Sequence, residues 1–521
     1  MTAPAAGPAD ITADITADIV IVGAGFAGIG MGIALDKAGR GDYVILEKAS
    51  EIGGTWRENT YPGCACDIRS LLYSFSFEPK RDWSRQYPLQ PEILEYLHQV
   101  VDTYDLARRI QFGAEVVSMA YDDSAGRWTV RLADGRTASC RVLMTATGPL
   151  HQPNIPALPG AGSFAGPQFH SAQWDHSVDL TGKRVTVIGT GASAIQFVPQ
   201  VAAKAAQVTV FQRTPPWVMA KPDRPFTQRQ HKLFRAVPGL QRAYRWLIYW
   251  EAEWTIVTFT KPRLAGLGER MARAHISKQI PDPDLRRKVT PDYRMGCKRV
   301  LLANDYYPAL AQPHVQLVTE QVTAITETGV TAADGTEYPA DVIVYGTGFH
   351  VIDAFDHADI TGANGRKIAE IWRDGAEAYL GLAVAGFPNL FVLLGPNSGL
   401  GHNSMIFMIE SQVHYVLKCL DLIDRKGALA VGDQAQRRFN ADLQRRLTGS
   451  VWTSGGCRSW YLDKSGVNRA LWPGSTVSYW RRTRRLSAGD FESAVAPGSR
   501  GAPPTENTAA GDVPATSVTA R

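Results

Sequence analysis

Two glycine-rich segments have the residue types and spacing to hold the pyrophosphate of a dinucleotide. Their key residues are Gly23, Gly25 and Gly28 in the first segment, and Gly189, Gly191 and Ala194 in the second. In this Gly-x-Gly-x-x-Gly pattern the first glycine permits a tight turn, and the second lets the backbone approach the phosphates. The third position needs a small residue so that a helix can pack on a strand. The phosphates would lie at the positive end of that helix.

Two residues about 20 positions further along the chain distinguish the two cofactors. Glu47 follows the first glycine segment, and Arg213 follows the second. A carboxylate accepts hydrogen bonds from ribose hydroxyls and repels a 2′-phosphate, whereas a guanidinium binds that phosphate through two hydrogen bonds. The first site should therefore take FAD or NAD, and the second should take NADPH.

The elements that position these residues are short apolar runs followed by helices. Runs at 18–22 and 43–46 surround the first glycine segment, and runs at 185–188 and 208–211 surround the second. This alternation predicts an α/β fold with two Rossmann-like, doubly wound parallel sheets. Two later runs, 142–148 and 342–348, end in Thr-Gly, where a small residue lets a strand pass close to a dinucleotide.

The composition is that of a globular protein, with 45% hydrophobic and 20% charged residues among 521. The net charge of +5 is too dilute over this length to indicate a nucleic-acid partner. Of the six cysteines only Cys64 and Cys66 lie close together, so we expect neither a disulfide framework nor a metal site. No secretory signal and no apolar run of about 18 residues is present. We therefore expect a reduced, cytoplasmic protein without membrane contact.

A longer motif stands just before the second glycine segment. Residues 164–175 read Phe-Ala-Gly-Pro-Gln-Phe-His-Ser-Ala-Gln-Trp-Asp. They resemble the signature of Baeyer–Villiger monooxygenases, Phe-x-Gly-x-x-x-His-x-x-x-Trp followed by Pro or Asp, and residues 54–67 resemble that family's other long pattern. The N- and S-oxygenating flavin monooxygenases share the glycine segments, but their linker pattern lacks the ending found at Trp174 and Asp175. The resemblance covers about residues 18–485.

The resemblance implies an enzyme that uses FAD, NADPH and molecular oxygen. Such an enzyme inserts oxygen next to a ketone carbonyl through a C4a-peroxyflavin and forms an ester or lactone. The peroxide and its adduct with the ketone are anionic, so a cation that keeps its proton stabilises both. The family's arginine matches Arg299, which follows Lys298 and precedes Asn-Asp-Tyr-Tyr at 304–307. Asp67 would lie against the flavin and orient Arg299.

The same matching assigns the cofactor contacts. FAD is expected at Gly23, Gly25, Phe26, Gly28, Glu47, Thr55, Trp56, Asp67, Tyr73 and Val117. NADPH is expected at Gly189, Thr190, Gly191, Ala192, Ser193, Ala194, Gln212, Arg213, Thr214, Lys298, Arg299 and Trp460. His170 is interpreted as a structural residue that couples the domains, although an imidazole could transfer protons.

The domains follow from the order of these motifs. An FAD-binding domain is predicted at 18–153 and 385–485, an NADP-binding domain at 154–224 and 291–384, and a helical insertion at 225–290. Residues 1–17 and 486–521 are predicted to be disordered tails, because they have too few large apolar residues to form a core. The aromatic run at 246–259 is interrupted by Glu251 and Glu253, so we interpret it as buried helix rather than a membrane-surface element.

Three alternatives remain open from the sequence. The same flavin chemistry could oxygenate nitrogen or sulfur. A flavin-binding redox protein without turnover would have lost Asp67, Arg213 or Arg299, and all three are present. A flavoprotein disulfide reductase would need a reactive cysteine pair, but a Cys-x-Cys bridge would be strained. The aromatic insertion favours a hydrophobic ketone as substrate.

Overall fold

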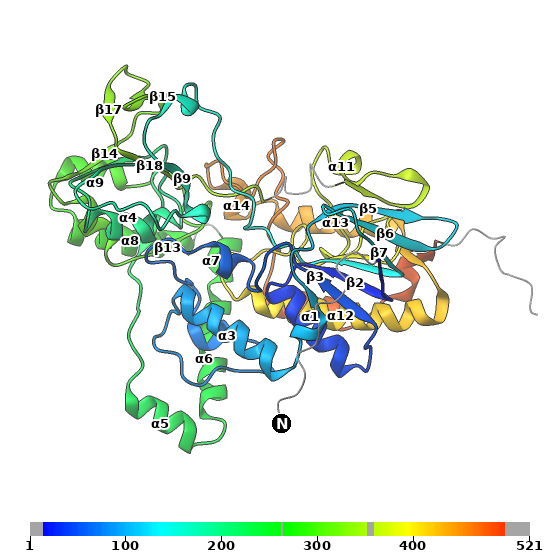
Figure 1. Cartoon of the computed structure of the whole chain (residues 1–521). Coiled ribbons are helices and arrows are strands. Elements are labelled where there is room, and N and C mark those ends of the chain that lie inside the picture. Colours follow the sequence, from blue (N-terminus) through cyan, green and yellow to red (C-terminus); the bar gives the residue numbers. More distant parts are fainter. Residues whose placement is uncertain (1–13, 262–263, 352–358, 495–521) are drawn as a thin grey trace, which may run out of the picture.

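Two parallel five-stranded sheets form the two halves of the structure, a computed structural model that describes residues 14–261, 264–351 and 359–494 (Figure 1). The first sheet has the order β20-β8-β2-β3-β4 and the second has the order β14-β11-β10-β18-β9. The first contains β2 (Ile19–Val22), β3 (Tyr43–Leu46), β4 (Ile110–Gln111), β8 (Val142–Thr145) and β20 (Leu390–Val392). The second contains β9 (Gln168–His170), β10 (Arg184–Ile188), β11 (Gln207–Phe211), β14 (Val315–Val318) and β18 (Val342–Tyr345).

Each glycine segment lies between a buried strand and a helix, as the sequence predicts. Strand β2 reads Ile-Val-Ile-Val, is buried at every position and leads into helix α1 (Phe26–Lys37). Strand β10 leads into α4 (Ala194–Ala202) in the same way. Strands that are covered on both faces are continuous apolar runs. The predicted α/β fold with two doubly wound parallel sheets is therefore confirmed.

The described residues form further sheets besides these two. A mixed sheet has the order β1-β7-β6-β5-β19, from β1 (Ile15–Thr16), β5 (Val116–Asp122), β6 (Arg127–Leu132), β7 (Thr137–Cys140) and β19 (Asp359–Thr361). An antiparallel sheet joins β15 (Val322–Thr326), β16 (Gly329–Ala332) and β17 (Glu337–Pro339). Two short pairs join β12 (Val218–Met219) to β13 (Leu301–Leu302), and β21 (Leu429–Val431) to β22 (Phe491–Ser493). Strand β19 thus pairs beside β5, although the sequence assigns residues 291–384 to the second domain.

Part of each predicted disordered tail forms a strand in the structure, which corrects the sequence interpretation for those residues. Strand β1 lies within the predicted tail 1–17 and pairs with β7. Strand β22 lies within the predicted tail 486–521 and pairs with β21, which gives its backbone hydrogen-bond partners. Residues 1–13 and 495–521 lie outside the described residues.

Helices occupy residues 225–290 and the C-terminal part of the chain. The first group is α5 (Gln228–Ala236), α6 (Leu240–Trp254), α7 (Ile256–Thr260), α8 (Ala265–Gln279) and α9 (Pro283–Val289). The second group is α12 (Met405–Lys426), α13 (Asp433–Leu447), α14 (Val451–Ser454) and α15 (Thr476–Thr483). The remaining helices are α2 (Thr55–Glu58), α3 (Gln90–Thr103), α10 (Tyr306–Leu310) and α11 (Ile368–Ile371). Helices α1 and α12 pack against each other below the first sheet (Figure 1). None of the helices in the described residues is both long and apolar enough to cross a membrane.

The aromatic run at 246–259 is only partly buried, which corrects the interpretation from the sequence. Ile248 and Phe259 are buried, at 5% and 9% exposure. Trp246 and Trp254 are 61% and 71% exposed. These indole side chains lie on the outer face of α6, so a run that looks uniformly apolar in sequence is divided by the helix into a buried and an open side.

Candidate active site

The first glycine segment makes a turn that leaves room for a ligand at only one of its glycines. Gly23 has a φ of +107°, and a Cβ on it would lie 2.8 Å from the Ala146 oxygen. A Cβ on Gly28 would lie 1.9 Å from the Gly23 oxygen. By contrast, a Cβ on Gly25 would have Gly54 Cα, at 3.8 Å, as its nearest neighbour. The protein's own packing does not require a glycine there, so the open space fits the approach of a dinucleotide.

The second glycine segment repeats this arrangement. Gly189 has a φ of +112°, and a Cβ on it would lie 2.3 Å from the Gly346 oxygen. A Cβ on Gly191 would meet nothing closer than that same oxygen, at 3.9 Å. Ala194 is fully buried and packs against Gly346. The Thr-Gly strand predicted to lie beside the dinucleotide therefore also supports the glycine turn.

Glu47 lies at the first turn, where the sequence places it. It is 5% exposed, and its carboxylate accepts hydrogen bonds from the backbone of Ala24 at 2.8 Å and of Ala49 at 3.0 Å. A carboxylate has about four lone-pair positions, so it can also accept from ribose hydroxyls. Val117 is 52% exposed near the start of β5. The segment just before it is tied to Glu47, because the Ala114 amide donates to the Glu47 backbone oxygen at 2.9 Å.

Aromatic side chains adjoin the first turn. Thr55 begins helix α2, and the indole of the next residue, Trp56, donates to the Tyr73 hydroxyl at 3.0 Å. The rings of Phe26 and Tyr73 meet edge to face at 5.4 Å. Burial raises the pKa of Tyr73 well above its usual value, so the phenol stays neutral. These predicted residues form one contiguous wall.

Arg299 and Asp67 form an ion pair between the two halves of the chain. The Arg299 Nε donates to one Asp67 oxygen at 2.9 Å, and Nη2 lies 2.8 and 2.7 Å from the two oxygens. Arg299 precedes β13, which pairs with β12, and this pairing fixes its backbone. The carboxylate of Asp67 is the largest influence that raises the pKa of Arg299, so the guanidinium stays charged. The two side chains keep 30% and 26% exposure. The predicted pairing is present.

A third residue, Tyr461, completes this cluster and was missed from the sequence. Tyr461 is 1% exposed and lies close enough to Arg299 to affect its pKa. Burial raises the pKa of Tyr461 to about 12, so it is a neutral hydroxyl near the cation. Trp460, which the sequence assigns to the nicotinamide cofactor, is 43% exposed and packs on Tyr461 with ring centroids 4.4 Å apart.

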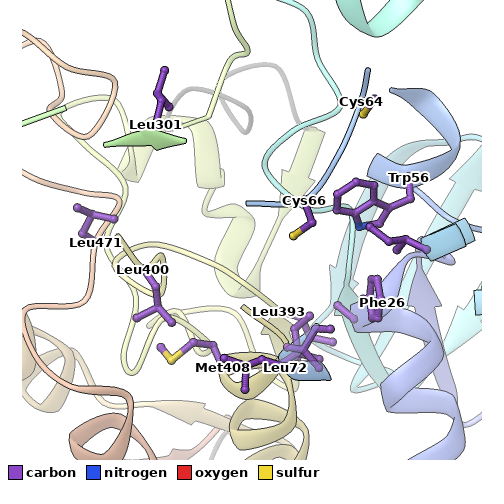
Figure 2. Packing of buried hydrophobic residues seen from close by; sticks show 14 of the residues in the cluster. Phe26, Trp56, Cys64, Cys66, Leu72, Leu301, Leu393, Leu400, Met408 and Leu471 are labelled. Atoms are coloured by element: carbon purple, nitrogen blue, oxygen red, sulfur yellow. The ribbon is translucent and has the colours of Figure 1, made fainter. Parts of the chain in front are cut away.

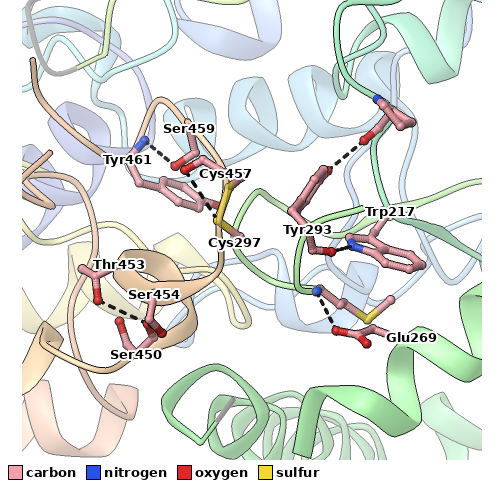
Figure 3. The surroundings of a disulfide bond; sticks show 12 residues. Trp217, Glu269, Tyr293, Cys297, Ser450, Thr453, Ser454, Cys457, Ser459 and Tyr461 are labelled. Atoms are coloured by element: carbon pink, nitrogen blue, oxygen red, sulfur yellow. Dashed lines mark hydrogen bonds between the residues drawn. A yellow bond between two sulfur atoms is a disulfide. The ribbon is translucent and has the colours of Figure 1, made fainter. Parts of the chain in front are cut away.

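A disulfide bond fixes the segment that carries Tyr461. Cys297 and Cys457 are bonded, 160 residues apart in sequence, which corrects the expectation of a fully reduced protein without a disulfide framework (Figure 3). The bond joins the segment that ends in Arg299 to the C-terminal segment that carries Tyr461. Spacing in the sequence gives no signal for such a distant pair, because only the fold brings the two cysteines together.

The second turn is bordered by cations. Burial lowers the pKa of Lys298, and the nearby positive charge of Arg213 lowers it further. Two neighbouring cations of this kind suit a dianionic phosphate. Thr190 is buried, and its hydroxyl donates to the Thr214 oxygen at 3.4 Å, while Gln212 is 2% exposed. The predicted residues Ala192 and Ser193 lie between Thr190 and the start of α4 along the chain. Ala192 is exposed, and Ser193 is partly exposed.

Contacts across the two halves hold the turns in a fixed relation. Gln196 on α4 accepts from the Tyr61 hydroxyl at 2.9 Å and donates to the Ala65 oxygen at 3.0 Å. No motif in the sequence selects this residue. His170 is fully buried at the end of β9, and burial lowers its pKa to about 4. Its Nδ1 accepts from the Ala172 amide at 3.1 Å. A neutral, buried imidazole fits the structural interpretation of His170.

Cys64 and Cys66 are not joined to each other. Both are buried free cysteines. Burial raises the pKa of Cys64 to about 12 and that of Cys66 further still. The thiolate is the reactive form of cysteine, so neither residue is poised for thiol–disulfide exchange. In the described part of the chain no group of three or more His, Cys, Asp or Glu residues is arranged to hold a metal ion.

Comparison with known proteins agrees with this geometry. Residues 20–229 match the family model of the pyridine nucleotide-disulphide oxidoreductases. A Baeyer–Villiger monooxygenase of Streptomyces coelicolor is 46% identical, over 91% of this chain and 92% of its own. The crystal structure of cyclohexanone monooxygenase from Rhodococcus sp. Phi1 bound to NADP⁺ superposes with a TM-score of 0.83 at 30% identity, covering 92% of this chain and 99% of that chain. The structure of OTEMO in complex with FAD and NADP also reaches 0.83, at 26% identity, covering 92% of this chain and 100% of that chain.

These similarities extend over both halves of the fold and are not confined to the glycine segments. The predicted enzyme class, FAD- and NADP-dependent monooxygenase of Baeyer–Villiger type, is thereby confirmed. Taken with the two dinucleotide turns and the Arg299–Asp67 pair between them, they show that the chain belongs to the Baeyer–Villiger monooxygenase family.

Proposed function

We propose that FAD binds at the turn of Gly25 and NADPH at the turn of Gly191. The open space beside each of these glycines supports the assignment. Glu47 would hold the ribose of FAD, and Arg213 with Lys298 would hold the 2′-phosphate of NADPH. Phe26, Trp56 and Tyr73 would contact FAD from one side, and Val117 would contact it from β5. Trp460 would contact NADPH. The predicted domain limits and the cytoplasmic location stay predictions.

We further propose that Arg299 is the catalytic cation and that Asp67 orients it. FAD, reduced by NADPH, supplies the activated oxygen when it is bound. Arg299 then stabilises the negative charge that develops on the ketone oxygen during attack. A guanidinium suits this role because it stays protonated and offers several N–H donors. The observation that carries the proposal is the three-contact pair of Arg299 with Asp67, since it fixes the direction of the guanidinium plane.

The substrate that we propose is a hydrophobic ketone. Cys66 precedes Asp67 and Leu301 closely follows Arg299, and both belong to the same hydrophobic cluster as Leu400 and Leu471 (Figure 2). Apolar residues of this cluster therefore lie within two positions of each member of the ion pair along the chain. Burial of a methylene group contributes about 0.8 kcal/mol, so kcat/KM should rise about three- to fourfold per methylene along a ketone series that fits the site.

The test measures products and rates together. The FAD-loaded enzyme is supplied with NADPH, ¹⁸O₂ and a series of linear and cyclic ketones that differ by one methylene. We expect esters or lactones that carry one ¹⁸O atom, in a near one-to-one ratio to the NADPH consumed. A hydroxyketone of equal length serves as the polar control. A kcat/KM that is flat along the series, or higher for the hydroxyketone, would contradict the hydrophobic-substrate proposal while leaving the oxygen insertion intact.

A further inference from the structure

Helices α5 and α6 form an arm with an apolar and a cationic surface that nothing in the reaction uses. Figure 1 shows α5 and the first part of α6 projecting from the body of the molecule. On α6, Trp246, Leu247 and Trp254 are 61%, 59% and 71% exposed. On α5, Leu233 is 50% exposed, and Val237 just after it is 42% exposed. Trp246 and Leu247 are adjacent on α6, and clustered exposed apolar side chains of this size mark a binding surface.

The opposite face of α6 is fixed to the protein body, so the outward direction of the indoles is defined. Arg245 donates to the Leu71 oxygen at 2.6 Å and to the Ser74 oxygen at 2.9 Å. One turn further along, the Tyr249 hydroxyl bonds that of Thr476 at 2.6 Å. These anchoring residues recur at intervals of about four, which is one face of a helix. The exposed indoles therefore cannot turn inward without breaking these contacts.

Glu253 anchors the last turn of α6. It is 4% exposed and accepts hydrogen bonds from Asn403 at 2.8 Å and from Thr476 at 2.9 Å. A buried carboxylate held by two donors is costly to displace. Of the two glutamates in this run, Glu253 therefore belongs to the inner face, whereas Glu251 is 63% exposed and pairs with Arg69 at 2.9 Å. Trp246 and Trp254 belong to the outer face.

The charge of the arm identifies what can cover it. From residue 224 to residue 254 the chain contains six Arg or Lys residues and two glutamates. Glu253 is buried, and Glu251 is paired with Arg69 of the protein body, so the arm keeps an excess of positive charge. Five of the six are exposed: Arg224, Arg229, Lys232, Arg235 and Arg242. A second copy of the same arm would bring like charges together, so the charge disfavours pairing through this surface. An anionic surface is favoured.

We propose that the α5–α6 arm docks on an anionic lipid surface. Helices that lie in the membrane interface combine Lys and Arg on one side with Trp and Leu on the other. Indoles are well suited to the headgroup level because they join an apolar ring to an N–H donor. Anionic lipids attract cations that lie close to the bilayer. The inference revises the sequence-based expectation of no membrane contact, and it stands independently of the cofactor and substrate assignments.

The test is flotation of the FAD-loaded enzyme with two kinds of vesicle. One contains phosphatidylcholine alone, and the other contains equal parts of phosphatidylcholine and phosphatidylglycerol. We expect binding to the second kind at low salt and loss of binding at high salt. The variant Lys232→Glu/Arg235→Glu should bind at least tenfold more weakly, because each cation near the surface contributes about fivefold to binding. Arg437→Glu/Arg438→Glu, on the exposed side of α13, is the matched control.

A second variant tests the apolar part of the surface. Trp246→Ser/Trp254→Ser should also lose at least tenfold in binding, while Trp480→Ser, at an indole that is 40% exposed on α15, should not. All variants should keep the wild-type rate of ketone oxidation in solution, which shows that they fold. Failure of the wild type to float with anionic vesicles would overturn the proposal. If the charge variant alone loses binding, the arm is a general polyanion site, as an acidic protein partner would need, and the lipid proposal fails.

Discussion

Replacement of Arg299 by Ala should abolish oxygen insertion while leaving the cofactors bound. The side chain makes three contacts of 2.7 to 2.9 Å with Asp67, and in the proposed mechanism it is the fixed cation near the reacting carbonyl. Removal of one neutral oxyanion donor costs about 10² to 10³ in kcat, so loss of a full charge should cost at least about 10³. Arg299→Lys keeps the charge, but its single nitrogen cannot reproduce the contacts of Nε and Nη2. We expect it to be about 10² slower.

Two assays separate catalysis from binding. Anaerobic reduction of the flavin by NADPH should proceed within about tenfold of the wild-type rate in Arg299→Ala. In air the same protein should consume NADPH and release hydrogen peroxide, with no ester detected by gas chromatography. Arg270→Ala, which removes an exposed arginine of α8, is the control and should behave as wild type. Ester formation within tenfold of wild type in Arg299→Ala would refute the assignment.

The stability of the same variants gives an independent check on the ion pair. Arg299→Ala leaves the carboxylate of Asp67 without its partner, which should lower the free energy of unfolding by about 2–3 kcal/mol. This expected loss is smaller than the 3–5 kcal/mol typical of breaking a deeply buried pair. The reason is that the two side chains keep 30% and 26% exposure, so water screens the unpaired charge. The double variant Arg299→Ala/Asp67→Ala should recover part of this loss, since no unpaired charge remains. Strict additivity in denaturant unfolding would show that the pair is not energetically coupled.

Three further predictions follow from the turns and from His170. Gly25→Ala should fold normally, because its Cβ would meet only Gly54 Cα at 3.8 Å. The same Cβ would fill the space proposed for the dinucleotide, so FAD should bind at least tenfold more weakly in a fluorescence titration. Gly28→Ala, whose Cβ would lie 1.9 Å from the Gly23 oxygen, should instead lose stability. Arg213→Ala should lower kcat/KM for NADPH by about 10- to 100-fold, the effect of about 1.5–3 kcal/mol of charged hydrogen bonding, and leave that for NADH unchanged. Burial lowers the pKa of His170 from 6.5 to about 4, so the unfolded chain takes up its proton first as the pH falls. As the pH falls from 6.5 to 4, His170 should therefore lower the free energy of unfolding by about 3 kcal/mol, and above pH 6.5 it should have no effect. In His170→Gln, the free energy of unfolding from denaturant titrations should no longer show this part of its pH dependence.

The features that the sequence predicts well are local. For each of the two glycine turns, the buried strand before it and the charged residue after the next strand lie within a few dozen residues of it. Each is specified by steric demands that can be read one residue at a time, such as the absence of space for a Cβ at Gly28. The pairing of Asp67 with Arg299 spans 232 residues and came from the family resemblance, not from spacing.

The features that the sequence does not reveal depend on long-range packing. Gln196, Tyr461 and the Cys297–Cys457 bond each join segments that are far apart in the chain. Their residue types are ordinary, so nothing in the local sequence distinguishes them from other buried residues. The exposure of Trp254 was mispredicted for the same reason, because hydrophobicity alone does not say which side of α6 meets the body.

The position of β20 affects the order in which the protein can fold during its synthesis. The second sheet has all its strands once β18 has been made, at Tyr345. The first sheet begins with β2 but waits for its edge strand, Leu390–Val392, and then for α12, which packs on α1. A nascent chain that pauses between Tyr345 and Leu390 would carry a complete second sheet, while strand β8 of the first sheet would still lack its partner β20. Unpaired strand edges invite aggregation, so ribosome pausing in this interval should reduce the yield of active enzyme more than pausing after Lys426.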